Sequence, residues 1–126
     1  MIFRVNPQSG VPLYIQLIEQ VRGAIEAGGL QPGDQLPGIR RVAEDLVMNP
    51  NTVAKAYREM EHAGLVELRH GAGAFISDRP VVAPSATYAE GRTIMRRAVG
   101  RLRELKLDEG AIRRLLESEL AKEVHA

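Results

Sequence analysis

Apolar residues recur at helical spacing in three stretches of the first two-thirds of the chain. The first stretch begins near Pro12, which suits the opening turn of a helix, and ends at the glycine pair that starts with Gly28. The period returns over residues 39–46 and again over residues 50–63. A three- and four-residue period of this kind is typical of amphipathic helices, so we predict three of them. The apolar face of the first consists of Tyr14, Leu17, Ile18, Val21 and Ile25.

The boundary between the second and third stretches lies at Pro50, in the sequence VMNPNT. A proline inside a helix costs about 3 kcal/mol, whereas a proline in the first helical position costs almost nothing. Asn49, directly before it, is a favourable N-cap residue. The pattern therefore predicts two helices joined by a short turn at residues 47–49, the second helix starting at Pro50 and stopping at Gly64. This is the spacing of a helix-turn-helix.

The period changes after Gly64. The runs LVELR and AFIS, separated by HGAG, predict a β-hairpin, which after a helix-turn-helix forms the wing of a winged helix. From Thr87 the helical period returns in two further helices, the second capped by Asp108. We thus expect a mainly α protein with a small β-hairpin. Its predicted parts are a winged helix-turn-helix domain (residues 1–78), a linker (79–86) and a two-helix dimerisation tail (87–126).

Composition excludes several functional classes. The 126 residues include no cysteine, and the three histidines, His62, His70 and His125, lack metal-ligand spacing. We expect no metal, no cofactor and no enzymatic activity. No run is long enough to span a membrane and the N-terminus lacks a signal-peptide layout, which favours a cytoplasmic, nucleoid-associated protein without a membrane partner. Lys plus Arg number 17 against 16 Asp plus Glu, so only the placement of charge can indicate a nucleic-acid partner.

Three segments carry a resemblance to a known family: PLYIQL, then GGLQPGDQLPGIRRVAEDL, then NPNTVAKAYREMEHAGLVELRHGAGAFI. Together, over about residues 11–77 and without a gap, they resemble the winged-helix domain of the GntR family of bacterial transcription regulators. The short tail looks like that of the YtrA subfamily. The resemblance implies a transcriptional repressor that dimerises through its tail, binds an inverted-repeat operator on double-stranded DNA and in many cases controls genes for a transporter.

Two positions depart from the family pattern. The family usually has a serine cap where this chain has Gly38, a weaker cap. The turn of the motif commonly holds glycine where this chain has Val47. A β-branched residue at positive φ is strained, which puts the geometry of this turn in question.

The helix predicted from Pro50 has two distinct sides at about 100° per residue. Val53, Ala56, Tyr57 and Met60 fall on one side, and Asn51, Lys55, Arg58 and His62 fall opposite. A winged helix places this helix in the major groove with its N-terminal residues nearest the bases. We therefore expect Asn51 and Lys55 to contact base edges and Arg58 a phosphate. Thr52 lies beside the N–H groups at the helix start, a suitable place for a phosphate.

Further DNA contacts follow from the resemblance. It implies that Arg40 contacts DNA at the start of the preceding helix and that His70 and Gly71 form the wing tip at the minor groove. Arg69 adds a candidate phosphate contact. The family's usual arginine at the position of Pro50 is missing, and so is its base contact. The alternatives are a merely solvated charged surface, a plain turn at His70, and a winged helix used only for protein contacts.

The tail helices carry the candidate dimer interface. Its residues are Ile94, Ala98, Leu102, Leu105, Ile112, Leu115 and Leu116. Two short helices cannot form a stable core alone, so these faces pack on a second subunit or, alternatively, on the winged helix. We expect the arginines of this region to pair with Glu104, Glu117 or Glu119, with an anionic ligand as the alternative. They are Arg92, Arg96, Arg97, Arg101 and Arg103. A small-molecule effector, if the protein has one, would bind between subunits or between tail and winged helix.

Overall fold

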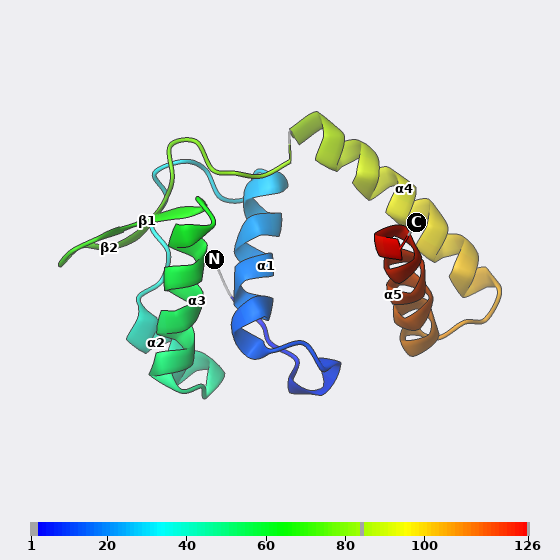
Figure 1. Ribbon diagram of the computed structural model, residues 1–126, viewed down its shortest axis with the longest axis horizontal. Helices are drawn as coiled ribbons and strands as arrows, with labels where there is room; N and C mark the ends of the chain where they lie inside the picture. The colour runs from blue at the N-terminus through cyan, green and yellow to red at the C-terminus, as the bar shows by residue number, and fades with distance from the viewer. Residues whose placement is uncertain (1–2, 84, 126) are drawn as a thin grey trace. The chain divides into compact units, whose positions relative to one another are not determined.

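The computed structural model describes residues 3–83 and 85–125, and Figure 1 shows its elements in chain order. A short 3-10 helix, η1 (Pro7–Ser9), precedes α1 (Leu13–Glu26), α2 (Ile39–Leu46) and α3 (Pro50–His62). The strands β1 (Val66–Arg69) and β2 (Gly73–Ile76) follow, and then the helices α4 (Ser85–Glu104) and α5 (Glu109–His125). The chain divides into two compact units after residue 85. The mainly α fold with one small hairpin is the predicted one.

The core of the first unit lies where α1 packs on α3, and the two helices run side by side (Figure 1). The apolar face predicted for α1 is buried at Leu17, Ile18, Val21 and Ile25, while Tyr14 at its start is half-buried. From α3 come Val53, Ala56, Tyr57 and Met60. The wing closes this core with Val66, Ala74 and Ile76. Three amphipathic helices, α2 included, and one face of the hairpin thus share a single apolar interior.

The start of α3 confirms the prediction for Pro50. Asn49 is the N-cap, and its side-chain oxygen accepts a hydrogen bond from the Asn51 N–H at 2.8 Å. The helix ends at His62, followed by Gly64 at φ 77°. Pro12, predicted for the first turn of α1, is instead its N-cap, one position earlier. These ends follow from local backbone chemistry, namely a capping side chain, proline and glycine.

The turn between α2 and α3 keeps a left-handed conformation although it holds valine. Val47 has φ 53° and ψ 52°, and the N–H of the next residue, Met48, donates to the Ala43 carbonyl at 2.9 Å. The Val47 side chain is 93% exposed. The turn therefore has a left-handed geometry that glycine adopts freely, with a β-branched residue in place.

The wing is an antiparallel pair with Val66 opposite Ile76 and Arg69 opposite Gly73. The segment before α2 lies along its other edge, since Leu36 N–H donates to the Ala74 carbonyl at 2.9 Å. This pairing joins the wing to the start of α2.

The second unit consists of α4 and α5. Helix α4 begins at Ser85, two positions before the predicted Thr87 and within the predicted linker. The earlier part of that linker lies against the first unit, where the Val81 N–H donates to the Gly64 carbonyl at 3.3 Å. Asp108 caps α5 as predicted, accepting from the Ala111 N–H at 2.8 Å. None of the helices in the described ranges is long and apolar enough to cross a membrane.

Candidate nucleic-acid interface

Helix α3 has the two-sided character that its sequence predicts. The side chains of Asn51, Lys55, Arg58 and His62 are exposed, and Thr52 is half-buried. The opposite side is buried, at relative exposures of 0–2% for Val53, Ala56, Tyr57 and Met60. The structure therefore presents the predicted polar residues together on one accessible helix surface.

The backbone at the start of α3 differs from the expectation for Thr52. The Thr52 N–H donates to the Asn49 carbonyl at 3.0 Å, and the Val53 N–H to the same carbonyl at 3.3 Å. The Asn51 N–H is occupied by the Asn49 side chain, and Pro50 has no N–H. The expected free N–H groups beside Thr52 are thus already engaged within the chain. A phosphate contact at this point has to come from the Thr52 hydroxyl.

Lys55 has a partner that the sequence did not indicate. Its ammonium nitrogen lies 4.0 Å from the centroid of the Tyr14 ring, which comes from the start of α1. The helical period assigned Tyr14 to the core face of α1, and the structure places it at the edge of that core, half-buried. The signal available in the sequence was an aromatic residue in the first turn of α1. Residue spacing along a single helix cannot indicate which residue of another helix that ring contacts.

The wing presents its predicted residues at an exposed tip. His70, Gly71 and Ala72 connect the strands, and Gly71 has φ 74°. The Arg69 guanidinium lies 4.3 Å from the centroid of the Phe75 ring, and it also forms an ion pair with Glu67 at 3.4 Å. This carboxylate offsets part of the positive charge with which Arg69 would attract a phosphate.

Arg40 is exposed in the first turn of α2, whose cap Gly38 makes no side-chain hydrogen bond. The position of this turn is set from α3, because the Tyr57 hydroxyl donates to the Pro37 carbonyl. Burial raises the pKa of Tyr57 well above its usual range, so the hydroxyl remains a donor in alkaline solution as well as at neutral pH. The start of α2, and Arg40 with it, is therefore anchored to the helix that carries Asn51.

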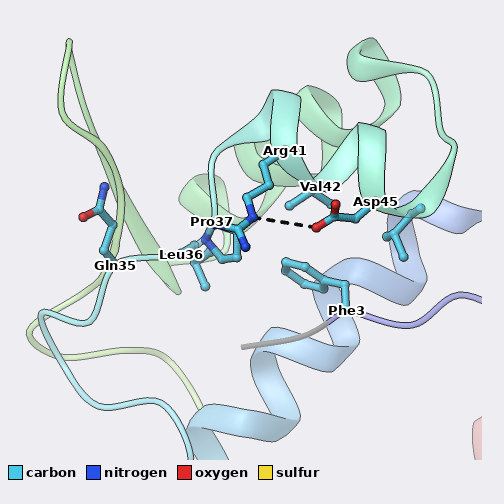
Figure 2. Close-up of a pocket in the computed structure, with 8 residues that line it drawn as sticks. Phe3, Gln35, Leu36, Pro37, Arg41, Val42 and Asp45 are labelled. Atoms are coloured by element: carbon cyan, nitrogen blue, oxygen red, sulfur yellow. Dashed lines mark ion pairs between the residues drawn. The ribbon is translucent and has the colours of Figure 1, made fainter.

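A hollow of about 410 Å³ lies beside α2 in the first unit. Figure 2 shows Phe3, Leu36 and Val42 around it, with the ion pair between Arg41 and Asp45 at 3.8 Å. Both charged side chains are largely exposed, so the pair contributes little to stability.

The tail leaves many of its predicted interface residues accessible. Ile94 is 61% exposed, Leu105 70%, Leu115 45% and Leu116 43%, whereas Leu102 and Ile112 are half-buried. A groove of about 660 Å³ lies between α4 and α5. It is lined mainly by apolar residues, including Met95, Ala98, Val99, Leu102, Ile112, Leu115 and Leu116.

Within the part of the chain that the structure describes, the ion pairs expected for the arginines of α4 are not formed. Among the described side chains, the tail's ion pairs are Arg113 with Glu109 at 2.6 Å and Lys122 with Glu119 at 3.3 Å. Both pairs lie within α5, three or four residues apart, where helix geometry brings side chains together. The prediction that Glu104, Glu117 and Glu119 pair with these arginines is wrong for the described residues.

Comparison with known proteins places this geometry in a family. A family model for bacterial regulatory proteins of the gntR family matches residues 13–76, from the start of α1 to the end of the wing. The transcriptional repressor YtrA of Bacillus subtilis is 37% identical over 94 residues, which are 75% of this chain and 69% of YtrA. The transcriptional regulator Rv1152 of Mycobacterium tuberculosis is 44% identical over 98 residues, 77% of this chain and 81% of that protein.

The fold is similar to that of solved regulators. The structure of YtrA from Sulfolobus acidocaldarius, a GntR-family transcription factor, aligns with a TM-score of 0.58 at 29% identity. The alignment covers 79% of this chain and 99% of that one.

Proposed function

This chain belongs to the GntR family of bacterial regulatory proteins, and on that premise we propose that it is a dimeric repressor that recognises an inverted-repeat operator. Its relatives are transcription regulators rather than enzymes, and it is a DNA-binding transcription regulator of the same family. The proposed partner is double-stranded DNA in the cytoplasm, at the nucleoid. The proposal needs no metal or cofactor.

The observation that carries the proposal is the exposed polar side of α3. Asn51 and Lys55 lie in the first turns of a helix whose start is fixed by the Asn49 cap, and both side chains are accessible. We assign Asn51 to an adenine edge and Lys55 to a guanine edge, because these side chains offer the matching donors and acceptors. Arg58 and the Thr52 hydroxyl contact phosphates.

Two further elements complete the proposed interface. Arg40, at the exposed start of α2, adds a contact beside α3. The wing tip brings His70 and Gly71 to the minor groove, and Gly71, which lacks a Cβ, permits a close backbone approach. Arg69 contributes a phosphate contact weakened by Glu67. The number of cations in one subunit is modest, so affinity depends on two subunits binding together.

The proposed dimer interface is the apolar side of the tail. Monomeric proteins rarely expose a large continuous apolar patch, yet α4 and α5 leave leucine and isoleucine side chains 43–70% accessible. A second copy of the tail would cover them and form a four-helix arrangement with enough apolar area for a core. The tail residues proposed for this contact are Ile94, Ala98, Leu102, Leu105, Ile112, Leu115 and Leu116.

The functional test is binding to genomic DNA fragments at two salt concentrations. The native chain should bind specific fragments, and its affinity should fall with salt because bound phosphates release counterions. Lys55→Ala should lose preference among sequences, whereas Lys122→Ala removes the same charge from the tail and should keep it. Absence of binding to any fragment at low salt would instead favour a winged helix used for protein contacts.

The dimer is tested by its mass in solution. Sedimentation should give twice the chain mass of 13.9 kDa for the native protein. Leu116→Glu places a carboxylate in the apolar groove and should shift the protein toward monomer. Lys106→Glu, which introduces the same group in the turn between α4 and α5, should remain dimeric. A native protein that sediments as a monomer at micromolar concentration would contradict the proposed interface.

The biological proposal extends to the regulated genes and to release from DNA. By analogy with the repressor YtrA, we assign this chain to repression, with a transporter operon as the target and a small-molecule effector that releases the dimer. Transcript levels in a strain lacking the gene test this. A rise in transcripts of genes beside the bound operator supports repression, and a fall would indicate activation.

A further inference from the structure

The ammonium group of Lys55 is held by an aromatic ring rather than by a carboxylate. Its nitrogen lies 4.0 Å from the centroid of the Tyr14 ring, within the range of a cation–π interaction. Glu59 is four residues further along α3, the spacing at which oppositely charged side chains meet on a helix. Lys55 nevertheless takes part in none of the ion pairs found among the described side chains. Its aromatic partner comes from α1.

A ring and a carboxylate have different consequences for a DNA-binding cation. A carboxylate offsets the charge of the ammonium and accepts hydrogen bonds from its N–H groups. The ion pair and these hydrogen bonds would have to be broken before the ammonium could bind a nucleic acid. A ring attracts the cation through its quadrupole and leaves the net charge and the remaining donors free. Arg69 shows the contrast, because it lies over Phe75 but is also paired with Glu67 at 3.4 Å. Lys55 is held in place without being neutralised.

The second consequence concerns conformational freedom. A lysine side chain has four rotatable carbon–carbon bonds. It loses most of this rotational freedom when its ammonium group becomes fixed against DNA. If the side chain is already held near its bound position, that loss is incurred on folding rather than on binding. Tyr14 is suited to this role, because its ring is half-buried and packs against the core of the first unit.

We propose that Tyr14 is a positioning residue for DNA recognition: its ring holds the Lys55 ammonium, still charged, at the DNA-facing side of α3. This inference rests on the proposed function and adds to it a residue of α1 that acts through Lys55. The interaction requires an aromatic face, so phenylalanine at position 14 should hold the ammonium as tyrosine does, whereas leucine should not. The hydroxyl of Tyr14 has no part in the inference.

The test is a double-mutant cycle on the full-length chain. The probe is a duplex that the native protein selects from a random-sequence pool. Tyr14→Leu should weaken binding about two- to fivefold per half-site, the range expected from the loss of one exposed cation–π contact. Tyr14→Phe should bind as the native chain does. In a Lys55→Ala background, Tyr14→Leu should have no further effect, because the cation that the ring holds is gone.

The cycle separates positioning from a purely structural role. If Tyr14→Leu weakened binding by the same factor with and without Lys55, Tyr14 would act through the fold or touch DNA itself, and the inference would be wrong. A Tyr14→Leu variant that bound like the native chain would also overturn it. Thermal unfolding of each variant confirms that binding is measured on folded protein. Failure of the native chain to select any duplex would overturn the proposed function itself, and the inference with it.

Discussion

Replacing Val47 by glycine should stabilise the protein, because this residue occupies a backbone conformation that its side chain disfavours. At φ 53° and ψ 52° the Cβ of an L-residue approaches the following carbonyl oxygen. A β-branched residue in this region is an outlier, while glycine adopts it freely. The turn that connects α2 to α3 thus carries strain at a single identified position.

The size of the effect follows from three contributions. Relief of the left-handed conformation is favourable by about 1–2 kcal/mol. The greater freedom of glycine in the unfolded chain opposes it by roughly 0.5–1 kcal/mol. Loss of side-chain burial adds little, since Val47 is 93% exposed. The net gain is about 1 kcal/mol, which for a domain of this size corresponds to a rise in Tm of roughly 4–8 °C.

The assay is thermal and urea unfolding of Val47→Gly beside the native chain. The matched control is Val11→Gly, an accessible valine, 41% exposed, that is not among the positive-φ residues. That variant should lose up to about 1 kcal/mol through chain entropy alone. If Val47→Gly lowered the Tm as the control does, the argument from left-handed strain would be refuted.

Three further changes test the local structure. Asn49→Ala removes the side-chain oxygen that accepts from the Asn51 N–H and should lower the free energy of unfolding, measured by urea titration, by about 1 kcal/mol. Asn49→Asp keeps an acceptor there and should retain most of the native stability. Gly64→Ala should lower the free energy of unfolding by about 2 kcal/mol in the same assay, because Gly64 has φ 77° and the alanine Cβ would lie 2.8 Å from the Val81 side chain. An unchanged free energy of unfolding would contradict the packing at this position. Tyr57→Phe tests the buried hydroxyl. Burial raises the folded-state pKa of Tyr57 above its unfolded value near 10, so the stabilising contribution of the neutral hydroxyl is complete below pH 10 and is lost as the pH rises beyond it. The difference in unfolding free energy between the native chain and Tyr57→Phe should therefore shrink above pH 10, and a constant difference would show that the hydroxyl is not held neutral by burial.

The helix-turn-helix and the wing could be predicted from the sequence because neighbouring residues specify them. The asparagine–proline pair specifies the start of α3 locally, because the capping hydrogen bond joins residues only two positions apart. The same holds for the glycines that end α1 and α3. The apolar period distinguishes the buried side of α3 from the exposed side, so the candidate DNA-contacting residues of this helix could be predicted from the sequence. The candidates on α2 and at the wing tip came from the resemblance to the family.

Other features depend on elements that are distant in sequence and adjacent in space. The ring beside Lys55 comes from α1, and the anchor of α2 is a hydroxyl from α3. The ion pairs are local in contrast: Glu119, which we expected to pair with an arginine of α4, pairs with Lys122 three residues further along its own helix. The sequence by itself determined where helices begin and end and which side of each is apolar, because these depend on residues within a few positions of one another. Only the tertiary structure decided which side chains of different elements meet, such as Lys55 with the Tyr14 ring, because that depends on which elements pack together and on distances of a few ångströms.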